Sequence, residues 1–226
     1  PDDDGVRDGP APSYRAGERR QITAMFCDIV GYTRLSHELD PEDLQTSLAD
    51  DQRACTHAIK RYDGHVAQFL GDGVLAYFGY PQAHEDDAER AIRAGIDIRT
   101  AMSEINRHRT AAGTPEMAIR IGLHTGPVLV TAVGDDAHRE TLALGETITI
   151  ASRLESIAPA GSVVISDETL RLVRGLFVTS SIGRPELKGI SEPIGAHLVQ
   201  GSASIGTRFA GVDAGRLTPL TGRGDF

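Results

Sequence analysis

The sequence predicts an α+β fold, with helices packed on one face of a mixed β-sheet that is built around a ferredoxin-like βαββαβ core. Two observations lead to this prediction. Apolar segments of strand length alternate with longer segments of helical periodicity, in the order β-α-α-β-β-α-β-α-β-α-β-β. The chain has 226 residues, of which 40% are hydrophobic, and this suits one domain with a substantial core and short tails.

The first half of the chain supplies the first strands and helices of this order. The apolar segment 21–29 predicts a strand, and a short helix is expected around 33–39. Segment 40–64 predicts a longer helix, because an Asp-Pro pair begins it and a glycine ends it. Segments 65–70 and 74–79 flank a Gly-Asp-Gly turn and predict a β-hairpin.

The second half begins with a long helix at 84–109, whose acidic start and basic end suit the helix dipole. An apolar strand is expected at 118–133, either regular or with a bulge at its glycines. The pattern then predicts a helix, a strand, a short helix and two further strands, at 145–158, 162–166, 167–173 and within 180–200.

The two ends of the chain differ from this pattern. Residues 1–18 are rich in Asp, Gly and Pro and are expected to form a disordered leader. Residues 201–226 lose the periodicity and are expected to be a linker toward a further C-terminal module. The functional domain is therefore expected at 19–200.

Composition narrows the classes of function. The formal net charge is −9 and the pI is near 5.3, which argues against a general binder of nucleic acids or anionic membranes. No apolar segment reaches the ~18 residues that span a bilayer. Cys27 and Cys55 are too few for a disulfide framework, so we expect a reducing, cytoplasmic compartment and a small buried role for Cys27.

Two aspartates lie where predicted strands end: Asp28 in FCDIVGYT and Asp72 in QFLGDG. On adjacent strands the two carboxylates could face each other, and Gly31, Gly71 and Gly73 would let a ligand approach the backbone. Two carboxylates beside open amides suit Mg²⁺ or Mn²⁺ bound together with a phosphate ester. The alternative is structural, with Asp28 capping the next helix and Asp72 making an ordinary turn.

Five motifs carry a resemblance to a known family. In order along the chain they are FCDIVGYT, QFLGDGVLAYFG, IRIGLHTGPV, GETITIASRLESIA and ELKGISEPIGAHLV. Their order and spacing resemble class III nucleotidyl cyclase catalytic domains over roughly residues 19–200. YFGYPQAHEDDAERAIRAG is similar to the bacterial branch fused to an ATPase-like module, and LTPLTGRGDF looks like the lead-in to such a module.

The resemblance implies that the chain is an adenylate cyclase, which converts ATP to 3′,5′-cyclic AMP and pyrophosphate. The 3′-hydroxyl of the substrate would attack its own α-phosphorus, with two Mg²⁺ or Mn²⁺ ions in the site. By this resemblance, Asp28, Asp72 and the Ile29 carbonyl would hold the ions. The segment that follows would contact the substrate, through Gly31, Tyr32 and Thr33.

Three residues of the second half match further parts of the family's site. Arg153 in TIASRLES would stabilise the charge that develops on the α-phosphate, and Thr149 stands where many members have an asparagine that orients the ribose or the transition state. Lys188 in ELKGI would contact the terminal phosphates. It is one of two lysines among 23 basic residues. Without the resemblance, Arg153 and Lys188 would read as surface residues.

The predicted base pocket departs from the family pattern. Adenine-selective members commonly have a lysine where this chain has Gln68 and an aspartate where it has Leu142. Gln68 can hydrogen-bond a base edge, whereas Leu142 can only pack against it. The alternatives are therefore a guanylate or low-selectivity purine cyclase, and a degenerate domain that binds nucleotide or dimerises to regulate another module. A cyclic dinucleotide synthase would usually show a GGDEF-like signature, which this chain lacks.

The two groups of predicted site residues come from opposite halves of the chain. In the resembling family, such halves meet across a head-to-tail dimer. We therefore expect a homodimer with two shared sites, in which one protomer provides the metal ligands. The partner would provide the rest: Gln68, Leu142, Thr149, Arg153 and Lys188. His124 in GLHTG and His84 are not assigned to chemistry, and His124 is expected to be a core or dimer-contact residue.

Overall fold

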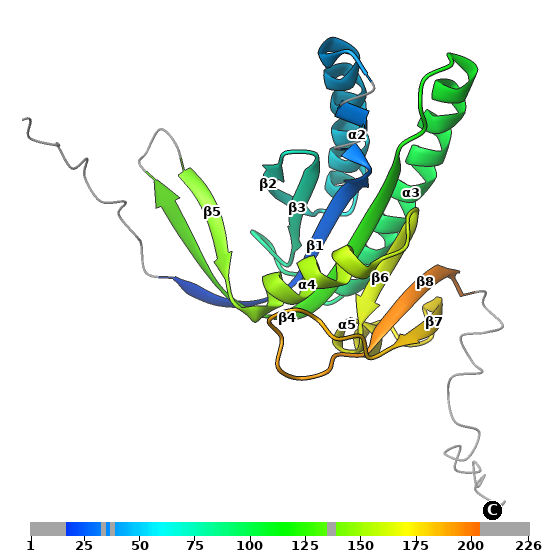
Figure 1. Ribbon diagram of the computed structural model, residues 1–226. Coiled ribbons are helices and arrows are strands. Elements are labelled where there is room, and N and C mark those ends of the chain that lie inside the picture. Colours follow the sequence, from blue (N-terminus) through cyan, green and yellow to red (C-terminus); the bar gives the residue numbers. More distant parts are fainter. Residues whose placement is uncertain (1–16, 33–34, 37–38, 135–138, 204–226) are drawn as a thin grey trace, which may run out of the picture.

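The computed structural model describes residues 17–32, 35–36, 39–134 and 139–203 (Figure 1). Within these residues, eight strands form a single sheet in the order β2-β3-β1-β4-β6-β8-β7, and β5 pairs with β4 outside this path. Most of the expected leader 1–18 and linker 201–226 lies outside the described residues, so these two assignments stay predictions.

The strands have the following bounds: β1 Glu18–Val30, β2 His65–Leu70, β3 Gly73–Phe78, β4 Ala118–Gly134, β5 Arg139–Leu144, β6 Ser162–Ser166, β7 Phe177–Gly183 and β8 Ala196–Ser202. The helices are α2 Pro41–Arg61, α3 Asp87–Ala111, α4 Glu146–Ile157 and α5 Asp167–Leu172. The short helix expected around 33–39 lies partly outside the described residues. Helical turns are present there, since the Leu35 amide donates to the Gly31 carbonyl and the Leu39 amide to the Leu35 carbonyl.

The predicted ferredoxin-like core is confirmed. The chain order β1-α2-β2-β3-α3-β4 gives the spatial order β2-β3-β1-β4, in which every neighbouring pair of strands is antiparallel. β6 then pairs with β4 in parallel, and β8 and β7 extend the sheet as antiparallel strands. The sheet is therefore mixed, as the alternation of strands and helices predicts.

Helices cover both faces of the sheet, so the prediction of one covered face was wrong. On β1, Met25 and Ile29 belong to the larger buried cluster, to which α2 and α3 contribute. Ile22 and Ala24 belong to a second cluster, which includes Ala151 of α4. Because successive side chains of a strand point to opposite faces, α4 lies on the other side of the sheet from α2 and α3, which lie side by side (Figure 1).

The position of α4 depends on a glycine in β4. A Cβ atom at Gly122 would overlap the backbone N of Glu155 and the backbone O of Ala151. Without that atom, α4 can lie directly on the strand. A sequence shows that a strand contains a glycine, but not which element approaches it, and this is why the second covered face was missed.

β4 and β5 form an arm that the sequence analysis predicted only in part. β4 continues past the core sheet to Gly134, and β5 returns beside it (Figure 1). β5 was not predicted, because its residues RETLAL do not alternate between apolar and polar. Leu129 of β4 lies opposite Leu144 of β5, and their side chains are 41% and 45% exposed. The arm thus presents apolar surface in the single chain.

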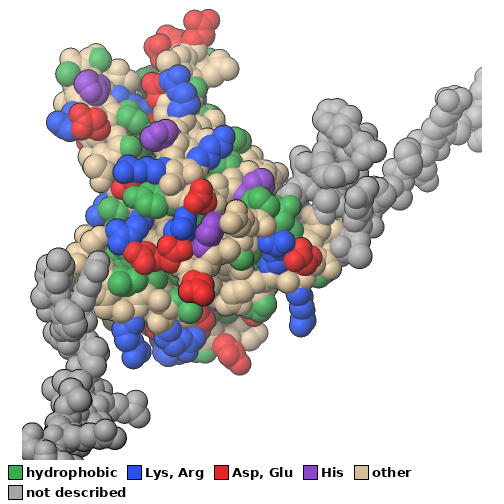
Figure 2. Space-filling view, turned by 180° about the vertical axis from the view of Figure 1, so that it is seen from behind, with side chains coloured by type: hydrophobic (Ala, Val, Ile, Leu, Met, Phe, Trp, Pro, Cys, Tyr) green, Lys and Arg blue, Asp and Glu red, His purple; other side chains and the backbone are tan. Residues whose placement is uncertain are grey.

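The remaining sequence expectations concern cysteines and surface charge. Cys27 and Cys55 are free and buried, with their sulfurs 3.8 Å apart, as expected for Cys27. The hydrogen bond with Cys55 and burial raise the pKa of Cys27 well above its ordinary value, which keeps the thiol protonated. Among the described helices, none is long and apolar enough to cross a membrane. The face in Figure 2 carries acidic and basic side chains intermixed, without a continuous basic area.

Candidate active site

Asp28 and Asp72 come together at the end of β1. Asp72 lies in the turn between β2 and β3, which Gly71 closes with a left-handed φ of 66°. β3 pairs with β1 so that Cys27 lies opposite Val74. This register brings the Asp28 carboxylate beside the turn, and burial followed by the charge of Asp28 raises the pKa of Asp72 above its ordinary value. The sequence analysis expected this pairing of carboxylates.

Two further charged residues complete this cluster, and the sequence analysis missed both. Arg120 of β4 is the cross-strand partner of Asp28, and its Nη2 donates a hydrogen bond to Asp28 Oδ2 at 3.0 Å. Arg120 Nε lies 3.0 Å from Oε1 of Glu155, whose side chain is 9% exposed. Burial raises the pKa of Glu155, and Arg120 opposes this shift. One guanidinium therefore lies between two carboxylates.

A weak signal for Arg120 is present in the sequence. Arg120 interrupts the apolar segment between Ile119 and Ile121, which both face the larger core cluster. A charged residue in such a strand must point to the other face and find a partner there. The partner itself depends on the register of β1 against β4 and on the position of α4, and neither can be read from one sequence.

The carboxylate cluster fits a divalent cation that brings some of its own ligands. Asp28 and Asp72 offer oxygen atoms, the ligands that Mg²⁺ and Mn²⁺ prefer, and Arg120 already provides a positive charge at Asp28. Among the described residues, no group of three or more His, Cys, Asp or Glu side chains is arranged to hold a metal ion. A cation here would therefore complete its coordination with backbone carbonyls, water or phosphate oxygens.

The residues that directly follow Asp28 were expected to contact ions and substrate. The Ile29 side chain is 5% exposed and packs in the core, so only its backbone is available to a ligand. Gly31 has a left-handed φ of 82°. Tyr32 is partly buried against the larger cluster, and Thr33 lies outside the described residues. The chain thus turns away from the sheet directly after the metal-ligand candidates.

Arg153 and Lys188 meet on another side of α4. Arg153 Nε donates a hydrogen bond to the Lys188 carbonyl at 3.0 Å, which joins α4 to the loop between β7 and β8. Thr149 lies one turn earlier on α4, and the side chains of Thr149 and Lys188 are exposed. The three residues predicted from the second half of the chain are therefore on one accessible part of the surface.

These two groups remain separate within the described part of one chain. Glu155 of α4 faces Arg120 and Asp28, whereas Arg153, two residues earlier, faces Lys188. Neither a hydrogen bond nor an ion pair joins Arg153 or Lys188 to Asp28 or Asp72 in the described residues. Positions two apart on a helix point in nearly opposite directions, which explains the separation. Each group is therefore an incomplete site by itself.

The two residues of the predicted base pocket lie on different strands. Gln68 is exposed on β2, next to a register shift in the pairing with β3. Leu142 lies on β5, opposite Thr131 of β4, and its side chain is outside what the structure describes. β2 and β5 are in contact, so these strands approach one another.

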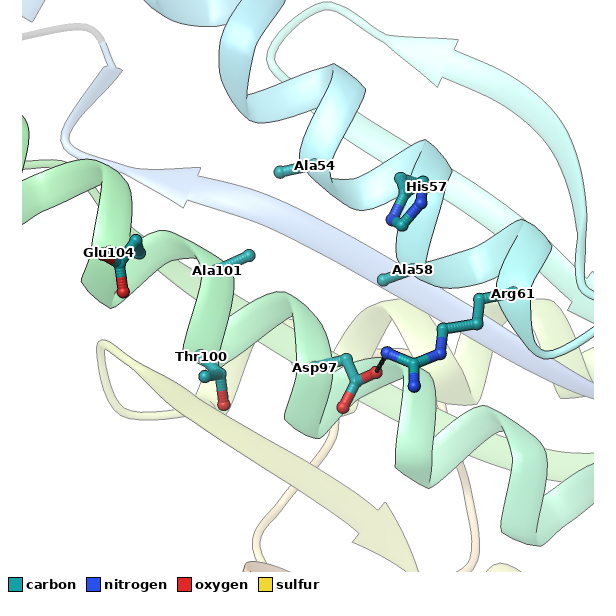
Figure 3. A pocket seen from close by; sticks show the side chains of 8 residues that line it. All are labelled: Ala54, His57, Ala58, Arg61, Asp97, Thr100, Ala101 and Glu104. Carbon is teal, nitrogen blue, oxygen red and sulfur yellow. Dashed lines mark hydrogen bonds and ion pairs between the residues drawn. The ribbon is translucent and has the colours of Figure 1, made fainter.

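A separate groove of about 370 Å³ runs between α2 and α3 (Figure 3). The ion pair of Arg61 and Asp97 crosses one end of it at 3.1 Å, and small side chains such as Ala54, Ala58 and Ala101 line much of the rest. This groove holds neither the carboxylate pair nor a cluster of basic residues. The face with Asp28 and Asp72 is therefore the better candidate, although it is not enclosed in the single chain.

Known proteins resemble this chain in sequence and in fold. The family model described as "Adenylate and Guanylate cyclase catalytic domain" matches residues 15–201. Adenylate cyclase 1 of Rhizobium meliloti (strain 1021) is 31% identical over 201 residues, which cover 85% of this chain and 30% of that protein. This chain therefore spans less than a third of that relative.

Two solved structures have a similar fold. The crystal structure of the adenylyl cyclase CyaB from P. aeruginosa aligns with a TM-score of 0.77 and 32% identity, covering 81% of this chain and 95% of that one. The crystal structure of the guanylyl cyclase Cya2 aligns with a TM-score of 0.78 and 28% identity, covering 84% and 97%. The mixed sheet with helices on it is the architecture that all three chains share.

Proposed function

Since this chain belongs to the family of adenylate and guanylate cyclase catalytic domains, we propose that it converts ATP to 3′,5′-cyclic AMP and pyrophosphate. One observation carries the proposal. Asp28 and Asp72 pair at one side of α4, and Arg153 and Lys188 meet at another. Joining the two groups across a pair of chains would bring cation ligands and phosphate-binding groups into one site.

In the proposed reaction, the 3′-oxygen of ATP bonds to the α-phosphorus, and the bond from that phosphorus to the pyrophosphate oxygen breaks. Pyrophosphate leaves with the bonding electrons, and the hydroxyl proton passes to solvent water. Domains of this class generally use divalent metal ions. Asp28, Asp72 and the Ile29 carbonyl would hold two Mg²⁺ or Mn²⁺ ions, which when bound acidify the hydroxyl and neutralise phosphate charge. The chain's own part is to fix these oxygens at the end of β1 and in the β2–β3 turn.

The other group would act on the phosphates. Arg153 offers a permanently charged, planar donor for the charge that develops on the α-phosphate, and its bond to the Lys188 carbonyl fixes its direction. The exposed Lys188 ammonium would neutralise the terminal phosphates, and the Thr149 hydroxyl would orient the ribose. Residues 31–33 would contribute backbone contacts to the substrate.

The proposal requires a homodimer, because one chain holds the two groups apart. A two-fold pair would close two sites, each with Asp28 and Asp72 from one protomer and Arg153 and Lys188 from the other. Exposed apolar side chains at the end of β2 and on the arm are available for such an interface: Phe69, Leu70, Leu129 and Leu144.

Gln68 and Leu142 would determine how the site selects between ATP and GTP. Gln68 can donate to and accept from a base edge, and Leu142 offers no hydrogen bond. This pair favours a site that accepts either purine, so a guanylate or low-selectivity purine cyclase is the second candidate. The similar proteins include both adenylyl and guanylyl cyclases.

The first test is product analysis by mass spectrometry. Concentrated protein is incubated with ATP or GTP, each with Mg²⁺ or Mn²⁺, beside Asp72→Ala. Asp40→Ala is the matched control, because Asp40 is an exposed aspartate whose side chain caps no helix. We expect cyclic nucleotide from wild type and Asp40→Ala, and none from Asp72→Ala. Nucleotide binding without product under all four conditions would instead indicate a regulatory module.

A further inference from the structure

We propose that Glu155 is a positioning residue for Arg120: it holds the guanidinium beside Asp28 and receives it when Asp28 takes a divalent cation. Before the cation binds, Arg120 would neutralise part of the negative charge of the carboxylates. When the cation binds, Arg120 would leave Asp28. This inference rests on the proposed metal site at Asp28 and Asp72. It adds a function for two residues outside that metal-ligand pair.

The contacts place one guanidinium between two carboxylates. Arg120 Nη2 donates to Asp28 Oδ2 at 3.0 Å, and Arg120 Nε lies 3.0 Å from Glu155 Oε1. The contacts use different nitrogen atoms of the same planar group. The side chains of Arg120 and Asp28 are 29% and 31% exposed, and that of Glu155 is 9% exposed. Glu155 is therefore the buried anchor, and Asp28 is the end that a ligand can reach.

The contact between Arg120 and Glu155 is short, but the two groups are not aligned as a hydrogen bond requires. Arg120 Nε and Glu155 Oε1 are buried, and neither has an aligned hydrogen-bond partner among the described residues. The other carboxylate oxygen, Oε2, accepts a long bond of 3.5 Å from Ser156 Oγ and no other hydrogen bond within the described part of the chain. A buried carboxylate with unused acceptor capacity can gain a hydrogen bond when the guanidinium turns toward it.

The charges of the cluster give a reason why the Arg120 guanidinium would move toward Glu155. Asp28, Asp72 and Glu155 are three carboxylates near one guanidinium, so negative charge is in excess. A cation at Asp28 and Asp72 would lie next to Arg120, and the like charges would repel. Glu155 offers the nearest alternative partner. Without its carboxylate, Arg120 would remain on Asp28 and compete with the cation.

The test measures Mn²⁺ binding without nucleotide, from the electron paramagnetic resonance signal of free Mn²⁺. We expect Glu155→Gln to weaken binding about tenfold or more, as the loss of a group that orients a metal ligand commonly does. In the Arg120→Met background the same change should have a much smaller effect, because no guanidinium is left to compete. Glu155→Asp should bind with intermediate affinity.

The matched control is Glu146→Gln, an exposed glutamate in the first turn of the same helix. It removes one negative charge from α4 away from the cluster and should leave Mn²⁺ binding unchanged. Thermal unfolding of each variant checks the fold, and Glu155→Asp carries the test if Glu155→Gln does not fold.

Two results would overturn the inference: unchanged Mn²⁺ binding in Glu155→Gln, or the same loss with and without Arg120. The second result would mean that Glu155 acts by its charge alone. Asp72→Asn separates this inference from the proposed function. If Asp72→Asn leaves Mn²⁺ binding intact, the metal site itself is wrong. If it abolishes binding while Glu155→Gln does not change it, only the positioning role is wrong.

Discussion

His124 illustrates how the fold sets the chemistry of a single side chain. It is 5% exposed, and its Nδ1 lies 2.8 Å from Ser166 Oγ. Burial lowers the pKa of His124 to about 4, and the nearby Glu168 opposes this shift only in part. The residue is therefore a neutral core histidine, which agrees with one of the two roles expected from the sequence.

This pKa predicts how stability depends on pH. An unfolded histidine has a pKa of about 6.5. As the pH falls below that value, His124 takes up a proton in the unfolded chain but stays neutral in the folded chain, which favours unfolding. Stability is thus lost between about pH 6.5 and about pH 4, on the order of 3 kcal/mol from this group. His124→Asn can keep a bond to Ser166 and should remove this part of the pH dependence. Urea unfolding at several pH values measures it.

The exposed His57 provides the control, because His57→Asn changes a histidine that the core does not enclose. Its unfolding free energy should follow the wild-type curve with pH. If His124→Asn follows that curve as well, His124 does not remain neutral in the folded chain.

The individual site residues show how far sequence reasoning reaches. Asp28 and Asp72 could be found because a strand end and a tight turn are local features. The pairing of Arg120 with Asp28 and Glu155 could not be found, because it depends on the β1–β4 register and on the position of α4. The contact of Arg153 with the Lys188 carbonyl also joins segments far apart in sequence.

Helix α4 carries both Glu155 and Arg153, so its position affects both groups of site residues. Gly122 of β4 permits that position. We expect Gly122→Ala to destabilise the fold by about 1–3 kcal/mol or more, because the new Cβ would overlap the α4 backbone at Glu155 and Ala151. It should also lower cyclase activity, since α4 carries both Glu155 and Arg153. Urea unfolding and product formation are the two measurements.

Gly201→Ala is the matched control for this change. Gly201 lies in β8, and a Cβ placed there meets no atom within 4 Å. Its substitution should alter stability by less than about 1 kcal/mol. Equal effects of the two alanines would mean that α4 does not rest on β4 as described.

Most of the helices and strands could be predicted from local features of the sequence. The strands and helices up to α3 follow from periodicity and from turn residues, and the ferredoxin-like core follows from their order. β5 lacks the alternation of apolar and polar residues that marks a half-buried strand. The side of the sheet on which α4 packs depends on tertiary contacts, which the periodicity of the sequence does not specify. Both misses concern the region where the proposed partner chain would bind.

At the scale of the whole molecule, the separation of the two residue groups predicts complementation. Asp72→Ala and Arg153→Ala should each be inactive alone. In a mixed dimer one site has both defects and the other has none. Random mixing makes about half of the dimers mixed, so up to about a quarter of the wild-type activity should return. Cyclic nucleotide formation after mixing and re-equilibration measures it.

The matched control mixes Asp72→Ala with the double variant Asp72→Ala/Arg153→Ala, because every site then lacks Asp72. This mixture should stay inactive. Wild-type specific activity should also fall on dilution as dimers dissociate. Mixed single variants that form dimers and yet stay inactive would contradict the shared site.

The length of β4 has a mechanical consequence. One strand runs from Ala118 to Gly134 and pairs with β1 over most of its length. At about 3.3 Å per residue, its backbone extends about 30 Å from Arg120 to the exposed Leu129–Leu144 pair. A displacement of the arm would therefore be transmitted along this continuous strand, which pairs with β1, to the guanidinium beside Asp28. From there it would reach the Asp28 carboxylate through the Arg120 side chain, so a second chain bound at the arm would be linked to the carboxylate pair.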